Sequence, residues 1–68
     1  MLQQDMAQVV EQARQFLNIA GYAFVRVVSV APDEEKHVWA VRADVGLTEV
    51  RIKEVAIDDR TGKVIGFP

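Results

Sequence analysis

The stretch ARQFLNIAGYAFVRVVSV, residues 13–30, contains the change of pattern that decides the fold. Up to Ala20 the apolar residues recur every three or four positions, which is typical of a helix with one buried face. After Gly21 the period changes to two, and the residues are rich in β-branched and aromatic types, which favours strands. The sequence therefore predicts a helix followed by a strand, with the boundary near Gly21.

The predicted helix extends back from this boundary to about residue 5. Asp5 is in position to cap its N-terminus, and Gln8, three residues later, completes a capping box. Gly21 stands where a left-handed residue commonly ends a helix. The opposite face is polar and lacks the lysine-rich flank of a membrane-surface helix. The apolar stripe of the helix consists of Met6, Val9, Val10, Ala13, Phe16, Leu17 and Ala20.

Strands are predicted over residues 23–30, 37–44 and 48–58, with a short fourth strand from Lys63 to Phe67. The intervening APDEEK and VGL segments are too short for crossover helices, so neighbouring strands should be antiparallel. We expect a single α+β domain over residues 1–68, with the order α-β-β-β-β. The N-terminal helix packs on one face of a three- to four-stranded antiparallel meander sheet.

Charged residues in mid-strand indicate which side of the sheet faces water. Arg26, Arg42, Arg51 and Lys53 mark the outer side in this interpretation. In the third strand the apolar residues change phase after Lys53, which predicts a β-bulge near Lys53–Glu54. The residues expected to line the core beside Phe16 and Leu17 are Val25, Val27, Trp39, Val41, Ala43, Val50 and Ile52.

The composition limits the possible classes of protein. The chain has 68 residues, of which 50% are hydrophobic and 26% charged, as in a globular domain, and it has no cysteine for disulfides. Its net charge of −2 offers no broad attraction to nucleic acid. No stretch approaches the roughly 20 apolar residues that span a bilayer, and the N-terminus lacks the pattern of a signal peptide. We therefore expect a cytoplasmic protein that binds neither membrane nor nucleic acid.

The stretch IDDRTGKVIGF, residues 57–67, contains letters that also occur in phosphate and metal sites. A P-loop needs a glycine five residues before the Gly-Lys pair and Ser or Thr after it, but Ile57 and Val64 occupy those positions. Adjacent aspartates followed by Arg60 do not match the alternating ligands of a calcium loop. The stretch is better explained as a tight hairpin turn with Gly62 at positive φ. We expect no metal and no cofactor here.

The order of elements, the aromatic second strand and the ending VAIDDRTGKVIGF resemble the PepSY-type domain over most of residues 9–67. This resemblance implies a small α+β module that binds or inhibits peptidases or regulates neighbouring domains. We expect this protein to differ from that family in having neither its export signal nor its partner domain. A second resemblance is to the accessory protein O of gas vesicles, whose arginine- and tyrosine-rich tail is absent here.

Catalytic residue types are few. His37 is the only histidine and Ser29 the only serine, so a Ser-His-Asp triad would have to use both. His37 is expected to begin a strand, and the acidic run Asp33–Glu35 is typical of a solvated turn. Trp39 is more typical of a core anchor than of a ligand platform. We therefore expect no enzymatic activity.

Apolar residues share the arginine-marked side of the predicted sheet. Because one helix covers only one side, this second side predicts a homodimer or another protein partner. The predicted function is a noncatalytic interaction or regulatory module. The alternative is a small-ligand-binding protein with a pocket between helix and sheet. The residues expected to form the interaction face are Phe24, Arg26, Val28, Val38, Ala40 and Arg42.

Overall fold

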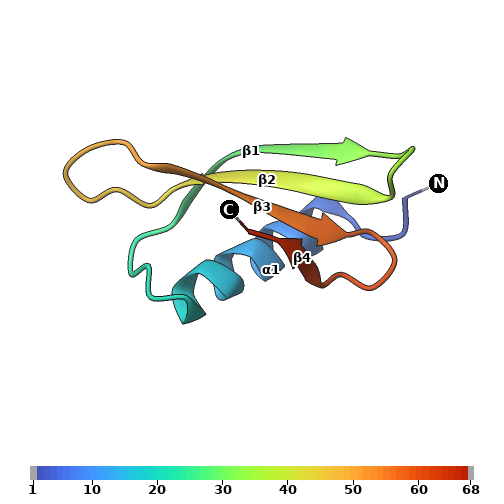
Figure 1. Ribbon diagram of the computed structural model, residues 1–68, viewed down its shortest axis with the longest axis horizontal. Coiled ribbons are helices and arrows are strands. Elements are labelled where there is room, and N and C mark those ends of the chain that lie inside the picture. Colours follow the sequence, from blue (N-terminus) through green and yellow to red (C-terminus); the bar gives the residue numbers. More distant parts are fainter. Residues whose placement is uncertain (1, 68) are drawn as a thin grey trace.

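One helix and four strands make up residues 2–67, the part of the chain that the structure describes. Figure 1 shows the computed structural model, in which the four strands form one antiparallel sheet in the order β1-β2-β3-β4. The predicted α+β meander is confirmed. The elements are α1 (Met6–Ile19), β1 (Arg26–Asp33), β2 (Val38–Asp44), β3 (Ile52–Asp58) and β4 (Val64–Gly66).

The two ends of α1 are fixed by the residues that the sequence indicated. The Asp5 carboxylate accepts the Gln8 N–H at 2.8 Å, and the Gln8 side chain accepts the Asp5 N–H at 2.9 Å. At the other end Gly21 has a φ of +109°, and the next N–H, that of Tyr22, donates to the Leu17 carbonyl at 3.0 Å. The capping box and the left-handed glycine are both confirmed.

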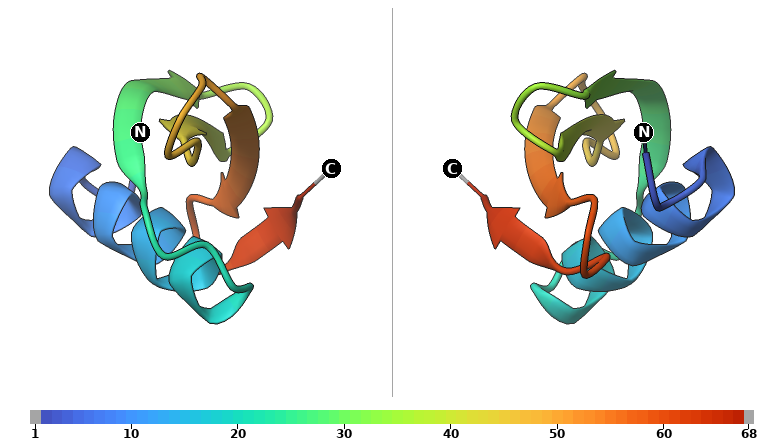
Figure 2. Two further views of the ribbon diagram at one scale, coloured as in Figure 1. Left: turned by 90° about the vertical axis from the view of Figure 1, so that its left-hand side faces the viewer. Right: turned by 90° about the vertical axis from the view of Figure 1, so that its right-hand side faces the viewer.

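The helix lies along one side of the sheet, as the end-on views of Figure 2 show, and it contacts each of the four strands. Val9, Ala13 and Leu17 form its buried stripe. At the C-terminal end of the helix, the Phe67 ring packs edge-on against Phe16 at 5.1 Å. Helix and sheet thus enclose one apolar core, to which the sheet and its β2–β3 loop contribute Trp39, Val41, Ala43, Val45, Val55 and Ile57.

The first strand begins and ends three residues later than predicted. Ala31, Pro32 and Asp33, predicted as part of a turn, pair with β2, and the turn occupies only residues 34–37. The register shifts between Val27 and Ser29, which makes Val28 an extra residue in the ladder. Such a bulge changes the phase of the strand, so the helix-facing apolar residues are Val25 and Val27 before it and Val30 after it.

The predicted phase of the third strand is wrong. Val50 lies in the loop before β3 and is 71% exposed, and Ile52 is 47% exposed. The β2–β3 register is regular from Asp44 opposite Ile52 to Val38 opposite Asp58, so there is no bulge near Lys53–Glu54. Lys53 lies opposite buried Ala43 on the helix side. Lys53 is only half-buried, because its long side chain can reach water from the end of the core.

The irregularity in this part of the sheet lies further along the chain, between β3 and β4. Ala56 is opposite Gly66 and Ile57 is opposite Val64, which leaves Ile65 as the extra residue. Val64 packs against the core, and Ile65 is exposed. The second bulge therefore lets the short last strand present one apolar side chain to each side of the sheet.

Candidate interaction face

The side of the sheet turned away from α1 carries no helix among residues 2–67 (Figure 2). We call it the outer face. Its members follow from the pairing register, because alternate residues of a strand point to opposite sides and Trp39, Val41 and Ala43 are buried against the helix. The outer face consists of Arg26, Ser29, Ala31, Asp33, Val38, Ala40, Arg42, Asp44, Ile52, Glu54, Ala56 and Asp58.

Small residues form a row across the middle of the outer face. Ala31 is opposite Ala40, Ala40 is opposite Ala56, and Ala56 is opposite Gly66, so the row crosses all four strands. A Cβ added at Gly66 would lie 3.3 Å from the Ala56 Cβ, so the row is closely spaced at that end. No side chain in the row is larger than a methyl group, which leaves the centre of the face apolar and low.

Exposed apolar side chains surround this row. Val28, at the bulge of β1, is 48% exposed, and Ile52 is the outer-face residue at the start of β3. Exposed Ile65 lines a small surface hollow of about 200 Å³ together with Val38 and the turns at that end of the sheet. The apolar surface therefore extends toward both ends of the strands.

The charged side chains of the outer face are partly paired within the chain. Arg26 Nη2 lies 3.4 Å from Asp44 Oδ2, and Arg42 Nε lies 3.2 Å from Glu54 Oε2. Both arginine side chains are largely exposed, and Glu54 is exposed as well, whereas the Asp44 side chain is only 7% exposed. The Arg42–Glu54 pair is therefore a surface pair of modest strength, and the exposed Arg26 reaches a buried carboxylate. The two pairs neutralise one end of the face. The other end carries Asp33 and Asp58 on the two sides of Val38.

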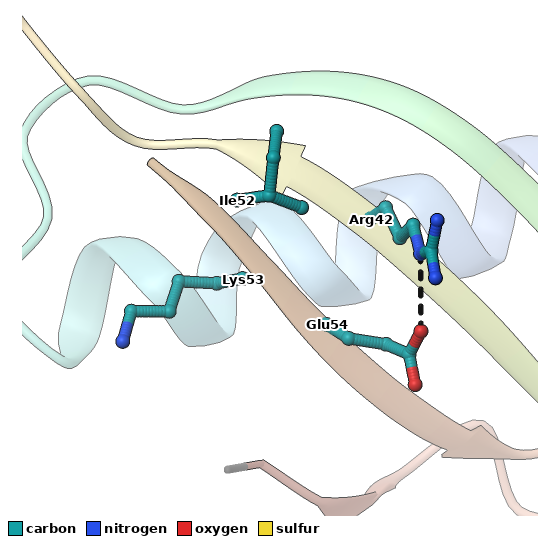
Figure 3. A pocket seen from close by; sticks show the side chains of 4 residues that line it. All are labelled: Arg42, Ile52, Lys53 and Glu54. Atoms are coloured by element: carbon teal, nitrogen blue, oxygen red, sulfur yellow. Dashed lines mark hydrogen bonds and ion pairs between the residues drawn. The ribbon is translucent and has the colours of Figure 1, made fainter. Parts of the chain in front are cut away.

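Figure 3 shows the hollow at the neutralised end, which has a volume of about 600 Å³ and is lined by Arg42, Ile52, Lys53 and Glu54. Arg42 and Glu54 face each other across it. The Lys53 side chain extends in a different direction, and Lys53 forms no ion pair within residues 2–67. The hollow therefore combines one apolar side chain, one internal ion pair and one ammonium group without a partner.

Asp44 organises the long loop beside this hollow. Its Oδ1 accepts the Gly46 N–H at 2.9 Å and the Arg51 N–H at 3.1 Å. These two backbone donors, and to a smaller extent the Arg26 guanidinium, hold the pKa of Asp44 below its ordinary value of 3.8. A side chain at Gly46 would overlap the Glu49 carbonyl oxygen, so the loop needs glycine there. The hydrogen bonds of Asp44 and the glycine at position 46 thus hold the conformation of this loop.

The DDRTG segment forms the predicted turn between β3 and β4. The Gly62 N–H donates to the Asp58 carbonyl at 2.8 Å, and the Asp58 N–H donates to the Lys63 carbonyl at 2.8 Å. Gly62 has a φ of +74°, as predicted. The residues around the Gly-Lys pair therefore close a hairpin by backbone hydrogen bonds.

Replacing Gly62 by valine is expected to cost about 1 kcal/mol or more, because a β-branched residue is strained at positive φ. An added Cβ would also lie 3.0 Å from the Gln4 Oε1. Lys63→Ala, one residue along the same turn, is the matched control and should cost little, since the Lys63 side chain is exposed. Urea unfolding of both variants tests this. Equal and negligible losses would contradict the role of Gly62.

Asp59 is a buried carboxylate that the sequence interpretation missed. It is fully buried and accepts three hydrogen bonds: from the Gln3 N–H at 2.7 Å, the Gln4 N–H at 2.9 Å and Trp39 Nε1 at 2.8 Å. Burial alone would raise the pKa of Asp59, but these donors and nearby His37 lower it below the ordinary 3.8. Every acceptor oxygen is occupied from within the chain. Asp59 is therefore a structural residue that ties the N-terminal segment to the sheet.

The residue types of a hydrolytic triad are not brought together. Ser29 lies opposite Arg42 in the sheet, whereas His37 precedes Val38, so a large part of β2 separates them. His37 ends the turn with a φ of +56° instead of beginning the strand as predicted. Its carbonyl accepts the Asp59 N–H at 2.9 Å. These two residues have separate surroundings in the fold.

The structure places the six predicted interaction residues at different distances from the centre of the outer face. Ala40 lies in the central row, and Val38 and Arg42 are its outer-face neighbours on β2. Arg26 lies at one end of the face, Val28 at its bulged edge, and Phe24 precedes β1 and is 39% exposed. The prediction missed the outer-face residues that β3 contributes: Ile52, Glu54, Ala56 and Asp58. It also missed Ile65, which is exposed on β4.

Comparison with known proteins adds no family to this description. No family model, curated protein or solved structure matches the chain. Within residues 2–67 there is no helix long and apolar enough to cross a bilayer. The same residues contain no group of three or more His, Asp or Glu side chains arranged to hold a metal ion. The fold and the outer face are thus the basis for a functional proposal.

Proposed function

We propose that this protein is a noncatalytic interaction or regulatory module that resembles PepSY-type domains. We further propose that it self-associates through its outer face. The observation that carries the proposal is the unequal cover of the sheet. One side is packed by α1, and the other presents the Ala31–Ala40–Ala56 row to solvent with Val28 and Ile52 exposed nearby. Covering such a surface gains about 25 cal/mol per Å² of apolar area.

A second copy is favoured because the outer face can be covered without leaving the charges at its neutralised end unpaired. Arg42 keeps Glu54 as its partner, and Arg26 keeps Asp44, inside each copy. The low central row allows two sheets to approach closely, as in stacked sheets about 10 Å apart. A two-fold axis through the face would apply the same row to itself, which makes the contact self-complementary.

Face packing is also favoured over edge pairing of identical copies. The free edge of β1 is interrupted by the bulge at Val28 and by Pro32, which has no N–H to donate. β4 pairs with β3 only at Ala56 and Ile57, and on the part of β3 left unpaired Lys53 lies on the inward side. Bulges, prolines and inward charges are devices that protect sheet edges from self-pairing. The outer face has no such protection.

A small-ligand pocket between helix and sheet receives less support. The space there is filled by buried apolar side chains such as Leu17, Val41 and Ile57. The hollows at Arg42–Lys53 and at Lys36–Ile65 lie at the surface instead. Separation of Ser29 from His37 supports the noncatalytic part of the proposal. The net charge of −2 supports a protein partner over nucleic acid.

Ala40→Glu is expected to abolish self-association, because it places a carboxylate at the centre of the outer face. The matched control is Ala7→Glu, the same substitution at an exposed position of α1. Sedimentation equilibrium over about a hundredfold range of protein concentration should give a dimer for the wild type and Ala7→Glu and a monomer for Ala40→Glu. A wild type that stays monomeric throughout, or an Ala40→Glu variant that dimerises as the wild type does, would contradict the proposal.

A further inference from the structure

Half of β3 has no neighbouring strand on its outward edge. The short β4 pairs with it only at Ala56 and Ile57, although β3 begins at Ile52. Figure 2 shows that β4 diverges from β3 toward the C-terminal end of the chain. Among residues 2–67, nothing pairs with the edge of the segment 52–55 on that side. We call this segment the open half of β3.

The backbone of the open half points its hydrogen-bonding groups outward at two residues. The Val45 N–H donates to the Arg51 carbonyl at 2.9 Å, and the Asp59 N–H donates to the His37 carbonyl at 2.9 Å, at the two ends of the β2–β3 ladder. Antiparallel ladders alternate, so the odd-numbered residues of β3 bond to β2. Ile52 and Glu54 therefore present two N–H donors and two C=O acceptors to the open side.

The side chains of the open half have unequal requirements. Ile52 is apolar and exposed on the outer face. Glu54 lies on the same face and forms an ion pair with Arg42. Lys53 points to the other side of the sheet and has no carboxylate partner among the described residues (Figure 3). A strand added here would thus meet an apolar residue and an acid on one side, and an unpaired ammonium group on the other.

A second copy of the same segment does not suit this edge. Two copies that pair antiparallel about a two-fold axis must place residues of the same side opposite each other. Three registers centre on this segment. In the first, Lys53 lies opposite Lys53 of the second copy, and in the second it lies opposite Arg51 of that copy. In the third, Glu54 lies opposite Glu54 of the second copy. Like charges directly opposite each other destabilise a strand pair. The charge pattern therefore excludes self-pairing and selects a different sequence.

We propose that the open half of β3 binds an extended segment of another protein as an added antiparallel strand. The bound segment has a lysine or arginine opposite Glu54, an aspartate or glutamate opposite Lys53, and an apolar residue opposite Ile52, in that order from its N-terminus. The residues opposite Glu54 and Ile52 exchange backbone hydrogen bonds with β3. The acid opposite Lys53 occupies the non-hydrogen-bonded position, where side chains lie closest. This site uses the backbone edge of β3, whereas self-association uses the outer face, and Ile52 and Glu54 belong to both.

The probe is a synthetic peptide with blocked ends, Thr-Lys-Glu-Val-Thr, titrated to millimolar concentration against isotope-labelled protein in an NMR experiment. The backbone amides of Ile52 and Glu54 are expected to shift in a saturable way. Methylating the valine amide nitrogen should weaken binding, because that N–H donates to β3. Methylating the glutamate amide nitrogen should not, because that N–H points away. Equal effects of the two methyl groups, or no shift at the open half, would overturn the proposal.

Charge reversal on the protein supplies a second, independent test. Lys53→Glu should weaken the binding of the Thr-Lys-Glu-Val-Thr peptide about fivefold or more. The Lys53→Glu protein should instead prefer the peptide in which lysine replaces glutamate. The monomeric Ala40→Glu variant should bind the probe as the wild type does, so a failure of the outer-face proposal leaves this result unchanged. If Lys53→Glu does not fold, Lys53→Gln replaces it and should bind the two peptides equally well. Binding of both peptides unaffected by either substitution would contradict the proposal.

Discussion

Asp59→Ala is expected to lower the melting temperature by about 10 °C or more. The substitution leaves the Trp39 indole N–H and the backbone N–H groups of Gln3 and Gln4 without their acceptor. Buried donors that lose their partner pay their full desolvation cost. The N-terminal segment would also lose its attachment to the sheet. Thermal unfolding followed by circular dichroism gives the measurement.

The neighbouring aspartate is the matched control for Asp59. Asp58 has the same side chain, but its carboxylate accepts only the Arg60 N–H at 2.8 Å among the described residues, at an exposed site. Asp58→Ala should therefore shift the melting temperature by a small fraction of the Asp59→Ala shift. Similar shifts for the two variants would contradict the assigned role of Asp59.

The same carboxylate predicts how stability depends on pH. The pKa of Asp59 is lower in the folded protein than its ordinary value of 3.8, and the same is true of Asp44. The stabilisation from each carboxylate is therefore complete above pH 3.8 and is lost as the pH falls through the lower folded-state pKa. The wild type should lose stability in that window, and Asp59→Asn should lose less than the wild type does.

Leu17→Ala is the second substitution with a large expected effect, about 2–5 kcal/mol. Leu17 is fully buried between α1 and the sheet, so the shorter side chain leaves a cavity in the core. Domains of this size have total stabilities of only about 3–10 kcal/mol. The Leu17→Ala protein should therefore lose a large fraction of its total stability. Urea unfolding, extrapolated to water, measures the difference.

Ile19→Ala on the same helix controls for helix propensity. Ile19 is exposed near the C-terminal end of α1, so its truncation removes no core contact. The expected change is within about 0.5 kcal/mol. An Ile19→Ala loss as large as that of Leu17→Ala would mean that α1 does not pack on the sheet through its Val9–Leu17 stripe.

The fold could be predicted because its determinants are local in the sequence. Asp5, Gln8 and Gly21 fix the ends of α1 through residues at most four positions away. Short connections between alternating segments are sufficient for an antiparallel meander. The adjacent valines at 27 and 28 also break the alternation of the first strand, which is a sequence signal for the bulge found there.

The errors arise where the tertiary structure decides between equal local choices. The usual preference of charged residues for water predicts Lys53 on the outer side, but the regular β2–β3 register places it on the helix side. Its long side chain can reach water from there. Asp58 and Asp59 have the same type and adjacent positions. Asp59 alone is buried, since it meets Gln3 and Gln4 from the other end of the chain. A pattern of neighbouring residues cannot predict a contact between such distant parts of the sequence.

Part of the candidate interaction face could be predicted for the same reason. Alternation alone predicts Arg26, Ala40 and Arg42 on the outer face, and the observed register puts them there. The outer-face residues of β3 could not be predicted, because the predicted phase of that strand is wrong. Ala56 becomes an expected outer-face residue once Val55 and Ile57 are known to be buried. The row from Ala31 to Gly66 can be recognised only from the pairing of all four strands.

Self-association through the outer face is tested most directly by isotope-filtered NMR on an equal mixture of labelled and unlabelled protein. Intermolecular nuclear Overhauser effects are expected at the methyl groups of Ala31, Ala40 and Ala56, which form the centre of the contact. The exposed methyl groups of Ala7 and Ile19 on α1 should show none. Effects confined to α1, or no intermolecular effects at a concentration where sedimentation gives a dimer, would contradict the account.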